Sequence, residues 1–398
     1  MSADVARLAE LIVGFGANVQ PGQVVAISSE PGKEELTREL AAAAYRAGAK
    51  FVDVWYFDLH VKRARLLHGA EEDLSYVPPW WGYRLERLAE MRGARIGLTG
   101  PASPDVFADV DPARAGMDQM PFLKESARIV NERTTNWCGF PCPTPGWARL
   151  VYPELEPEAA LARLWEEVLH VMRMDTDDPV AAWTERIGTM EAVAARLGER
   201  RFDAIRLRGP GTDLTVGLMP SSQWRAARFE TVDGIVHMPN LPTEELFTAP
   251  DPARVDGVVR ATKPLWLGGS IVDGIEVAFE RGRAVRIDAE RNAEVLRAYA
   301  ARDEGACRLG ELALVDGDGR IGPLGTIFYD TLLDENAASH IALGSAYAFC
   351  VSDEADAERI NHSAIHVDFM VGSPEVEVDG LTASGDAVPL LRGGAWQV

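Results

Sequence analysis

The sequence predicts two domains: an α/β N-terminal domain with a largely parallel sheet and an α+β C-terminal domain. The first third alternates helix-like and strand-like segments, a pattern typical of parallel sheets covered by helices. After about residue 200 the pattern changes to short strands separated by turn residues. A chain of 398 residues is long enough for two domains. We place them at residues 1–185 and 186–398.

The N-terminal elements follow from apolar spacing. Apolar residues at helical intervals predict a helix over 3–17, and a run rich in branched residues predicts a strand over 23–28. A second amphipathic helix is expected over 33–47, because Gly48 supplies a helix stop. The same reasoning adds a strand over 51–56, a helix over 83–92 and a strand over 95–99.

The middle of the chain is rich in glycine, proline and aromatic residues over 136–153. We interpret this stretch as a rigid surface or interface loop, which is followed by helices over 157–172 and 182–197. The later elements are expected to be strands over 204–207, 213–218, 274–279 and 284–288, with one helix over 290–301.

Composition excludes several classes of partner. The formal net charge is -21, from 61 acidic and 40 basic residues, and this excess repels nucleic acid and anionic membranes. The four cysteines (Cys138, Cys142, Cys307 and Cys350) are too scattered for a disulfide framework, so we expect reduced thiols. Since neither a signal peptide nor an apolar stretch of about 18 residues is visible, a soluble cytoplasmic protein is expected.

His366 and Asp368 are the first candidate metal ligands. They are separated by one residue in an apolar, strand-like segment, and residues i and i+2 of a strand point to the same face. An imidazole and a carboxylate that project together suit zinc or cobalt. The pair alone is weak evidence, because His-x-Asp is a common triplet.

His340 and Tyr347 form a second candidate pair. They are seven residues apart, so in a helix they would be two turns apart and face one cavity. The alternative is a capped helix with a buried tyrosine that has no catalytic role.

Three glutamates stand in unusual surroundings. Glu244 and Glu245 are adjacent in a segment whose backbone is restricted by flanking prolines. Glu311 stands between apolar neighbours, where a carboxylate is costly to bury without a cationic partner. A metal ion is one such partner, and an arginine or a helix end is the other.

Taken together, two glutamates, two histidines and an aspartate are the ligand set of a two-metal hydrolase. One carboxylate can bridge the ions, while the pair of ions activates a water and polarises a scissile carbonyl.

The sequence closely resembles the thermophilic aminopeptidase T family, which includes aminopeptidases S and II, over essentially its whole length. The resemblance is carried by NVQPGQ at 18–23, PTPGWA at 143–148, DPVAAW at 178–183, GPGTDLTV at 209–216, PTEELFTAP at 242–250, GELALV at 310–315, DENAASHIALG at 334–344 and HVDFMVGS at 366–373. It implies a cytoplasmic, homodimeric metallo-exopeptidase that removes N-terminal residues from small peptides. The implied cofactors are two divalent ions, zinc or cobalt, with magnesium or manganese as alternatives.

The resemblance also implies roles for residues of the C-terminal, metal-binding domain. The family's ligands correspond to Glu245, Glu311, His340, His366 and Asp368, with Glu311 as the bridging carboxylate. The family's active-site tyrosine corresponds to Tyr347. Local sequence does not separate Glu244 from Glu245, but spacing to Glu311 favours Glu245 as the ligand. Glu244 is then a candidate water-activating base.

One departure from the family is a shorter segment between Tyr347 and His366, which puts the carry-over of substrate preference in doubt. A different enzyme is the main alternative, since the family's fold is similar to that of a ring-cleaving pyridinediol dioxygenase. One iron would need only His340, His366 and Asp368, so the retention of two glutamates argues against it. A non-catalytic peptide-binding protein would be expected to lose a ligand, and none is lost.

Overall fold

The computed structural model describes residues 2–118, 120–121 and 124–398. The chain divides into a first unit of residues 1–186 and 227–243 and a second unit of residues 187–226 and 244–398. The boundary that the sequence suggests at 185/186 stays a prediction about folding domains. The structure adds a return of 227–243 to the first unit, where Leu241 N donates to Gly139 O at 3.0 Å. This return depends on backbone pairing between distant segments, which local sequence patterns do not encode.

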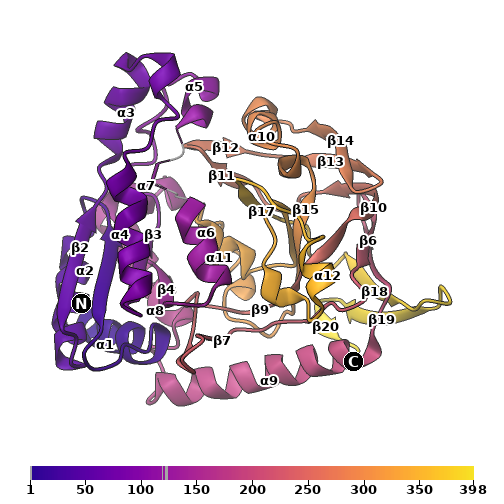
Figure 1. The fold of residues 1–398 in the computed structure, drawn as a ribbon, viewed down its shortest axis with the longest axis horizontal. Helices are drawn as coiled ribbons and strands as arrows, with labels where there is room; N and C mark the ends of the chain where they lie inside the picture. The colour runs from indigo at the N-terminus through magenta and orange to yellow at the C-terminus, as the bar shows by residue number, and fades with distance from the viewer. Residues whose placement is uncertain (1, 119, 122–123) are drawn as a thin grey trace. The chain divides into compact units, whose positions relative to one another are not determined.

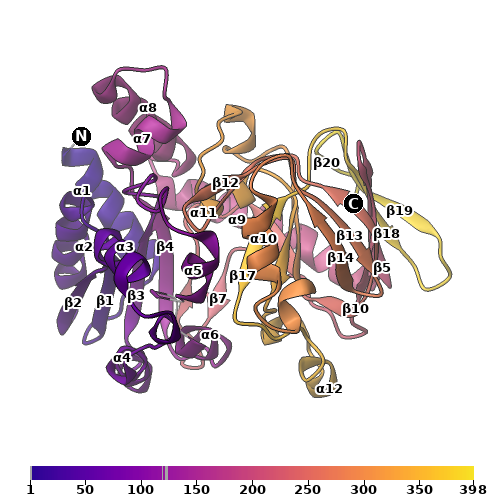
Figure 2. The same cartoon turned by 90° about the horizontal axis from the view of Figure 1, so that it is seen from above.

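The first unit contains a four-stranded sheet in the order β2-β1-β3-β4 (Figures 1 and 2). All three strand pairs are parallel, as the alternation of helices and strands predicted. Helix α1 packs on α2, and α2 contacts β1 and β2. The strands are β1 (Val24–Ser29), β2 (Phe51–Tyr56), β3 (Ala94–Thr99) and β4 (Asn136–Pro141), and two short strands, β7 (Phe229–Glu230) and β8 (Val236–His237), pair with each other.

The helices of the first unit match most of the predicted ranges. The segment expected as one helix over 3–17 is α1 (Ser2–Leu11) followed by a π-helical turn, η1 (Ile12–Gly16). The others are α2 (Glu34–Arg46), α3 (Leu59–His68), η2 (Glu71–Asp73), α4 (Pro79–Glu90), α5 (Pro112–Met117), α6 (Lys124–Asn131), α7 (Pro145–Val151) and α8 (Pro157–Val171), while α9 (Pro179–Arg200) runs through the division between the units.

The expectation of a loop over 136–153 is wrong, because this stretch forms β4 and α7. The side chain of Thr144 accepts a hydrogen bond from Trp147 N at 3.2 Å, and Pro145 occupies the first helical position. A threonine cap followed by proline is a helix-start signal. The prolines and glycine that suggested a loop therefore mark the beginning of a helix.

The second unit contains two main antiparallel sheets and the short antiparallel pair β11-β12 (Figure 1). The larger has the order β14-β13-β10-β6-β5-β18-β19-β20, and the smaller has the order β17-β16-β15-β9. Strand β15 of the smaller sheet contacts β10 of the larger, and all seven residues of β15 are buried. The smaller sheet therefore forms the interior of this unit.

The elements of the second unit have the following bounds. The strands are β5 (Ala204–Gly209), β6 (Thr212–Leu218), β9 (Glu245–Thr248), β10 (Pro250–Arg260), β11 (Leu265–Leu267), β12 (Ser270–Val272), β13 (Glu276–Glu280), β14 (Arg283–Asp288), β15 (Leu309–Val315), β16 (His340–Gly344), β17 (His366–Met370), β18 (Glu377–Leu381), β19 (Ala387–Arg392) and β20 (Ala395–Trp396). The helices are α10 (Ala293–Ala300), α11 (Thr331–Glu335) and α12 (Glu354–Ala357), with 3₁₀ turns η3 (Gly305–Cys307), η4 (Gly322–Leu324) and η5 (Ala348–Cys350). Within the described ranges, none of the helices has both the length and the apolar character that a membrane crossing requires.

The cap of α7 gives a test of this fold. Thr144 is buried, and its replacement by alanine leaves the backbone N–H of Trp147 without its acceptor. We expect Thr144→Ala to lower the free energy of unfolding by about 1 kcal/mol. Thr184→Ala, at an exposed position inside α9, is the matched control and should change stability by less than about 0.5 kcal/mol. Equal stability of the two variants in denaturant titrations would contradict the cap.

Candidate metal centre

The small sheet of the second unit brings together acidic side chains that are far apart in the sequence. Glu311 of β15 and Asp368 of β17 both pair in register with Ala342 of the central strand β16. Residues opposite one another in an antiparallel sheet project to the same face. The two carboxylates therefore flank β16 on one face of the sheet.

The two histidines and Glu245 belong to the same face. His340 is two residues before Ala342 on β16, and His366 is two residues before Asp368 on β17, so the period-2 alternation of a strand keeps each pair together. Glu245 begins β9 and pairs with Val315 of β15. The strand that the His-x-Asp spacing predicted is present in β17.

The distances show how tightly these groups are gathered. His340 Nε2 lies 2.9 Å from Glu245 Oε2 and 3.6 Å from Glu311 Oε1. His366 Nε2 lies 3.2 Å from Asp368 Oδ1 and 3.5 Å from Glu311 Oε2. The two oxygens of Glu311 thus face different histidines, which places this carboxylate at the centre of the cluster.

The other ring nitrogen of each histidine faces a backbone carbonyl. His340 Nδ1 is 3.2 Å from Ala338 O, and His366 Nδ1 is 2.8 Å from Ser345 O. A nitrogen beside a carbonyl oxygen must carry the hydrogen to form a hydrogen bond. In the neutral rings, the lone pair is then on Nε2 and points at the carboxylates, which is the orientation that metal-binding histidines use.

Glu335 is a further carboxylate of the cluster that the sequence analysis did not select. It is the last residue of α11, is buried, and its carboxylate groups with His340 and Asp368 with all ligand atoms within 4.8 Å of one another. Helix α11 contacts β17, which holds Glu335 beside the sheet. Its position five residues before His340 in the DENAASHIALG motif was the available signal.

The adjacent glutamates Glu244 and Glu245 point in different directions. Glu245 lies against His340, whereas the carboxylate of Glu244 lies beside Gly319, where an added Cβ would approach its Oε2 to 3.3 Å. Among the described residues, Glu244 is in none of the three groups of side chains arranged to hold a metal ion. The geometry therefore favours Glu245 as the member of the cluster.

The pKa shifts of the acidic members reflect an excess of negative charge. Burial raises the pKa of Glu335 well above its ordinary value, and repulsion by Glu245 and Asp368 raises it further. Burial also raises the pKa of Glu311, although a hydrogen bond with His340 works against it. Two buried oxygens, Glu245 Oε2 and Asp368 Oδ1, lie against His340 Nε2 and His366 Nε2, which can donate a hydrogen bond only when the rings are protonated.

The histidines respond to the same charges in the opposite direction. Burial lowers the pKa of His366, but the charge of Asp368 outweighs it and raises the pKa to about 10. Burial likewise opposes protonation of His340, and Glu245 and Glu311 raise its pKa well above the ordinary value. Four buried carboxylates around two imidazoles attract positive charge, and the donor set fits divalent metal ions.

Tyr347 lies at the edge of the cluster, but the helix proposed for 340–347 is wrong. His340–Gly344 is a strand because it pairs with both β15 and β17, and Tyr347 follows in the turn before η5. Its ring is 5.9 Å from that of His366 and stacks on Phe349 at 5.0 Å. Burial and the nearby carboxylates, Glu311 first, raise the pKa of Tyr347, so its hydroxyl keeps its proton.

Comparisons with known proteins agree over the whole chain. Residues 1–396 match the family model described as thermophilic metalloprotease (M29). The chain is 42% identical to aminopeptidase T of Thermus thermophilus, covering 98% of each. It is 36% identical to aminopeptidase 2 of Geobacillus stearothermophilus, covering 98% of this chain and 97% of the relative.

Solved structures give the same result. Wild-type AmpT from Thermus thermophilus superposes with a TM-score of 0.90 at 42% identity, covering 100% of this chain and 99% of that one. A 2,5-dihydroxypyridine dioxygenase from Pseudomonas putida has a TM-score of 0.55 at 14% identity, covering 100% and 97%, a similarity of fold alone. On this evidence the chain belongs to the M29 family of thermophilic metalloproteases.

Proposed function

We propose that the cluster holds two divalent metal ions. Glu245 and His340 would ligate one ion, His366 and Asp368 the other, and Glu311 would bridge them. The observation that carries this proposal is the position of Glu311, whose two oxygens face the two histidines and which belongs to two of the three ligand groups. Four ionised carboxylates are also balanced by two divalent ions.

Family membership and the similarity to named aminopeptidases over the whole chain make this protein a metal-dependent aminopeptidase. Its substrates in this proposal are small peptides, from which it removes the N-terminal residue. The free α-amine of a peptide would bind a metal ion or a carboxylate of the cluster, which accounts for removal of the N-terminal residue.

Divalent ions at this site would polarise the scissile carbonyl and lower the pKa of an attacking water. We assign to Glu335 the transfer of the water proton, because its carboxylate groups with His340 and Asp368 and burial raises its pKa, which favours acceptance of a proton. Tyr347 keeps its proton and can donate a hydrogen bond to the oxyanion. Glu244 remains the alternative base, at the cost of a side-chain movement away from Gly319.

The mixed set of imidazoles and carboxylates favours zinc or cobalt, with magnesium or manganese as alternatives. We further propose a cytoplasmic homodimer, on the resemblance to the family alone. The effect of the segment between Tyr347 and His366 on substrate preference stays a prediction.

The activity is tested with leucine 4-nitroanilide and short peptides. We expect zinc or cobalt to restore hydrolysis in metal-stripped protein, and mass spectrometry of metal content to find two ions per chain. Glu311→Gln should lose both activity and at least one ion, since the bridge serves both positions. A folded protein that turns over no substrate with any divalent metal would contradict the proposal, and a single bound iron would favour the oxygenase.

Metal binding should depend on pH in a defined direction. The pKa of His366 is about 10 when no metal competes for its lone pair, so the ring is protonated at neutral pH and must lose that proton to bind a metal. We therefore expect zinc affinity to rise from pH 6 to pH 9, with proton release that calorimetry in buffers of different ionisation enthalpy can count. His366→Ala should release fewer protons, whereas His362→Ala, at an exposed position, should behave as wild type. An affinity independent of pH would refute this account.

The adjacent candidates for the proton-transfer role can be separated by two matched variants. We expect Glu335→Gln to lower kcat by about 10²- to 10⁴-fold with two ions retained. Glu244→Gln should leave kcat within about threefold of wild type, because its side chain lies outside the cluster. The reverse result would assign the role to Glu244, and loss of an ion from Glu335→Gln would make Glu335 a ligand instead.

A further inference from the structure

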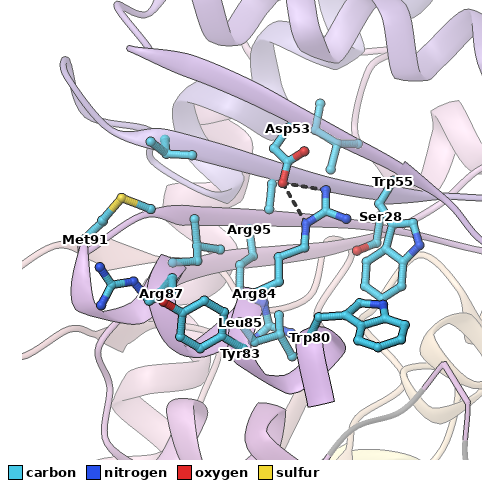
Figure 3. Close-up of a pocket in the computed structure, with 14 residues that line it drawn as sticks. Ser28, Asp53, Trp55, Trp80, Tyr83, Arg84, Leu85, Arg87, Met91 and Arg95 are labelled. Carbon is cyan, nitrogen blue, oxygen red and sulfur yellow. Dashed lines mark hydrogen bonds and ion pairs between the residues drawn. The ribbon is translucent and has the colours of Figure 1, made fainter. Parts of the chain in front are cut away.

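The first unit contains a pocket that takes no part in the metal centre. Its volume is about 320 Å³, and it is lined by β1, β2, α4 and the start of β3 (Figure 3). A volume of this size suits a small organic molecule. Small residues stand side by side on β1 and β3, where Ser28 of the lining pairs in register with Gly97. A Cβ added to Gly97 would meet nothing within 4 Å.

Arg95 is the unusual group in this pocket. Its Nη2 donates to Ser126 Oγ at 2.8 Å, but its Nη1 is buried and has no hydrogen-bond partner among the described residues. Burial lowers the pKa of Arg95 to about 10, and within the described part of the chain no carboxylate offsets the loss of hydration. A buried guanidinium nitrogen without an acceptor is costly. An anion that accepts a hydrogen bond from Arg95 would remove this cost.

The other two arginines of the pocket already have partners. Arg84 Nε donates to Asp53 Oδ2 at 2.8 Å, and its guanidinium lies 5.2 Å from the centre of the Trp55 ring. Arg87 pairs with Glu90. The pocket therefore offers one uncommitted positive charge. That favours a ligand with a single negative charge, such as a carboxylate, over a dianionic phosphate.

The remaining lining is aromatic. Trp55 is held by an edge contact with Trp81 at 4.2 Å between ring centres. Figure 3 shows Trp80 beside Trp55 at one end, with Tyr83 towards the other. Trp80 and Tyr83 remain 66% and 57% exposed; the Arg87 guanidinium lies 5.7 Å from the centre of the Tyr83 ring, so Trp80 is the ring with more surface to cover a ligand. Aromatic rings of this kind stack with, or pack edge-on against, a planar apolar body.

We propose that this pocket binds a small aromatic monocarboxylate, whose carboxylate pairs with the guanidinium of Arg95 and whose ring packs on the aromatic lining. This site shares no residue with the metal cluster, because all its lining residues belong to the first unit whereas every residue of the metal cluster belongs to the second. A binding measurement on the full chain tests it without reference to activity.

The experiment titrates phenylacetate into the full-length protein and follows calorimetry and tryptophan fluorescence. We expect saturable binding at one site per chain, with phenylacetamide, the neutral analogue, at least tenfold weaker. Arg95→Met should weaken phenylacetate at least tenfold. The matched control, Arg46→Met, removes an exposed arginine that pairs with Glu10 and should leave affinity unchanged.

Trp80→Ala keeps the test decisive if Arg95→Met does not fold, because Trp80 is exposed and its loss should weaken binding severalfold without unfolding the protein. Absence of saturable binding, equal affinity for phenylacetamide, or displacement of phenylacetate by an equal concentration of inorganic phosphate would each overturn the proposal. A further outcome would also overturn the proposal: wild type binds no phenylacetate and Trp80→Ala changes the sedimenting mass. The pocket would then be a contact between two copies of the chain.

Discussion

The main electrostatic constraint in the second unit is the mutual repulsion of four carboxylates that the fold buries close together. Glu245, Glu311, Glu335 and Asp368 have little access to water, so neither hydration nor salt screens their charges. Two imidazoles cannot neutralise four carboxylates, which is why burial and repulsion raise the pKa of Glu335 while the pKa of His366 rises to about 10. Divalent cations would relieve this excess, and the same charges would tie metal affinity to pH.

Strand pairing converts this electrostatic requirement into geometry. Register across β17, β16 and β15 sets Asp368, Ala342 and Glu311 in one row, and the small side chain of Ala342 leaves room between the two carboxylates. A slip of one residue would turn every ligand of a strand to the opposite face. Because β15 is buried on both faces, such a slip would move Glu311 to the opposite buried face, away from His340 and His366, and leave its charge unpaired there.

The first unit shows the same physics with the opposite sign. Arg95 is a cation with a buried, unsatisfied nitrogen in an aromatic pocket, whereas the cluster of the second unit is a group of buried carboxylates that exceeds its two imidazoles. In both places a charged group is held away from water at a cost in stability, and a ligand of opposite charge would recover that cost. Neither pattern is visible from composition, since an overall charge of -21 says nothing about which charges are buried.

The sequence by itself determined the parallel sheet of the first unit, most of its helices, and the residue types that meet at the metal centre, because period-2 and helical spacing are local properties of the chain. It misread 136–153, where Thr144 and Pro145 begin a helix, and 340–347, where pairing on both sides imposes a strand. Only the tertiary structure placed Glu245 beside His340 and Glu244 beside Gly319, added Glu335 to the cluster and left Arg95 Nη1 without an acceptor among the described residues. Each of these outcomes depends on contacts between segments far apart in the chain, which local spacing does not record.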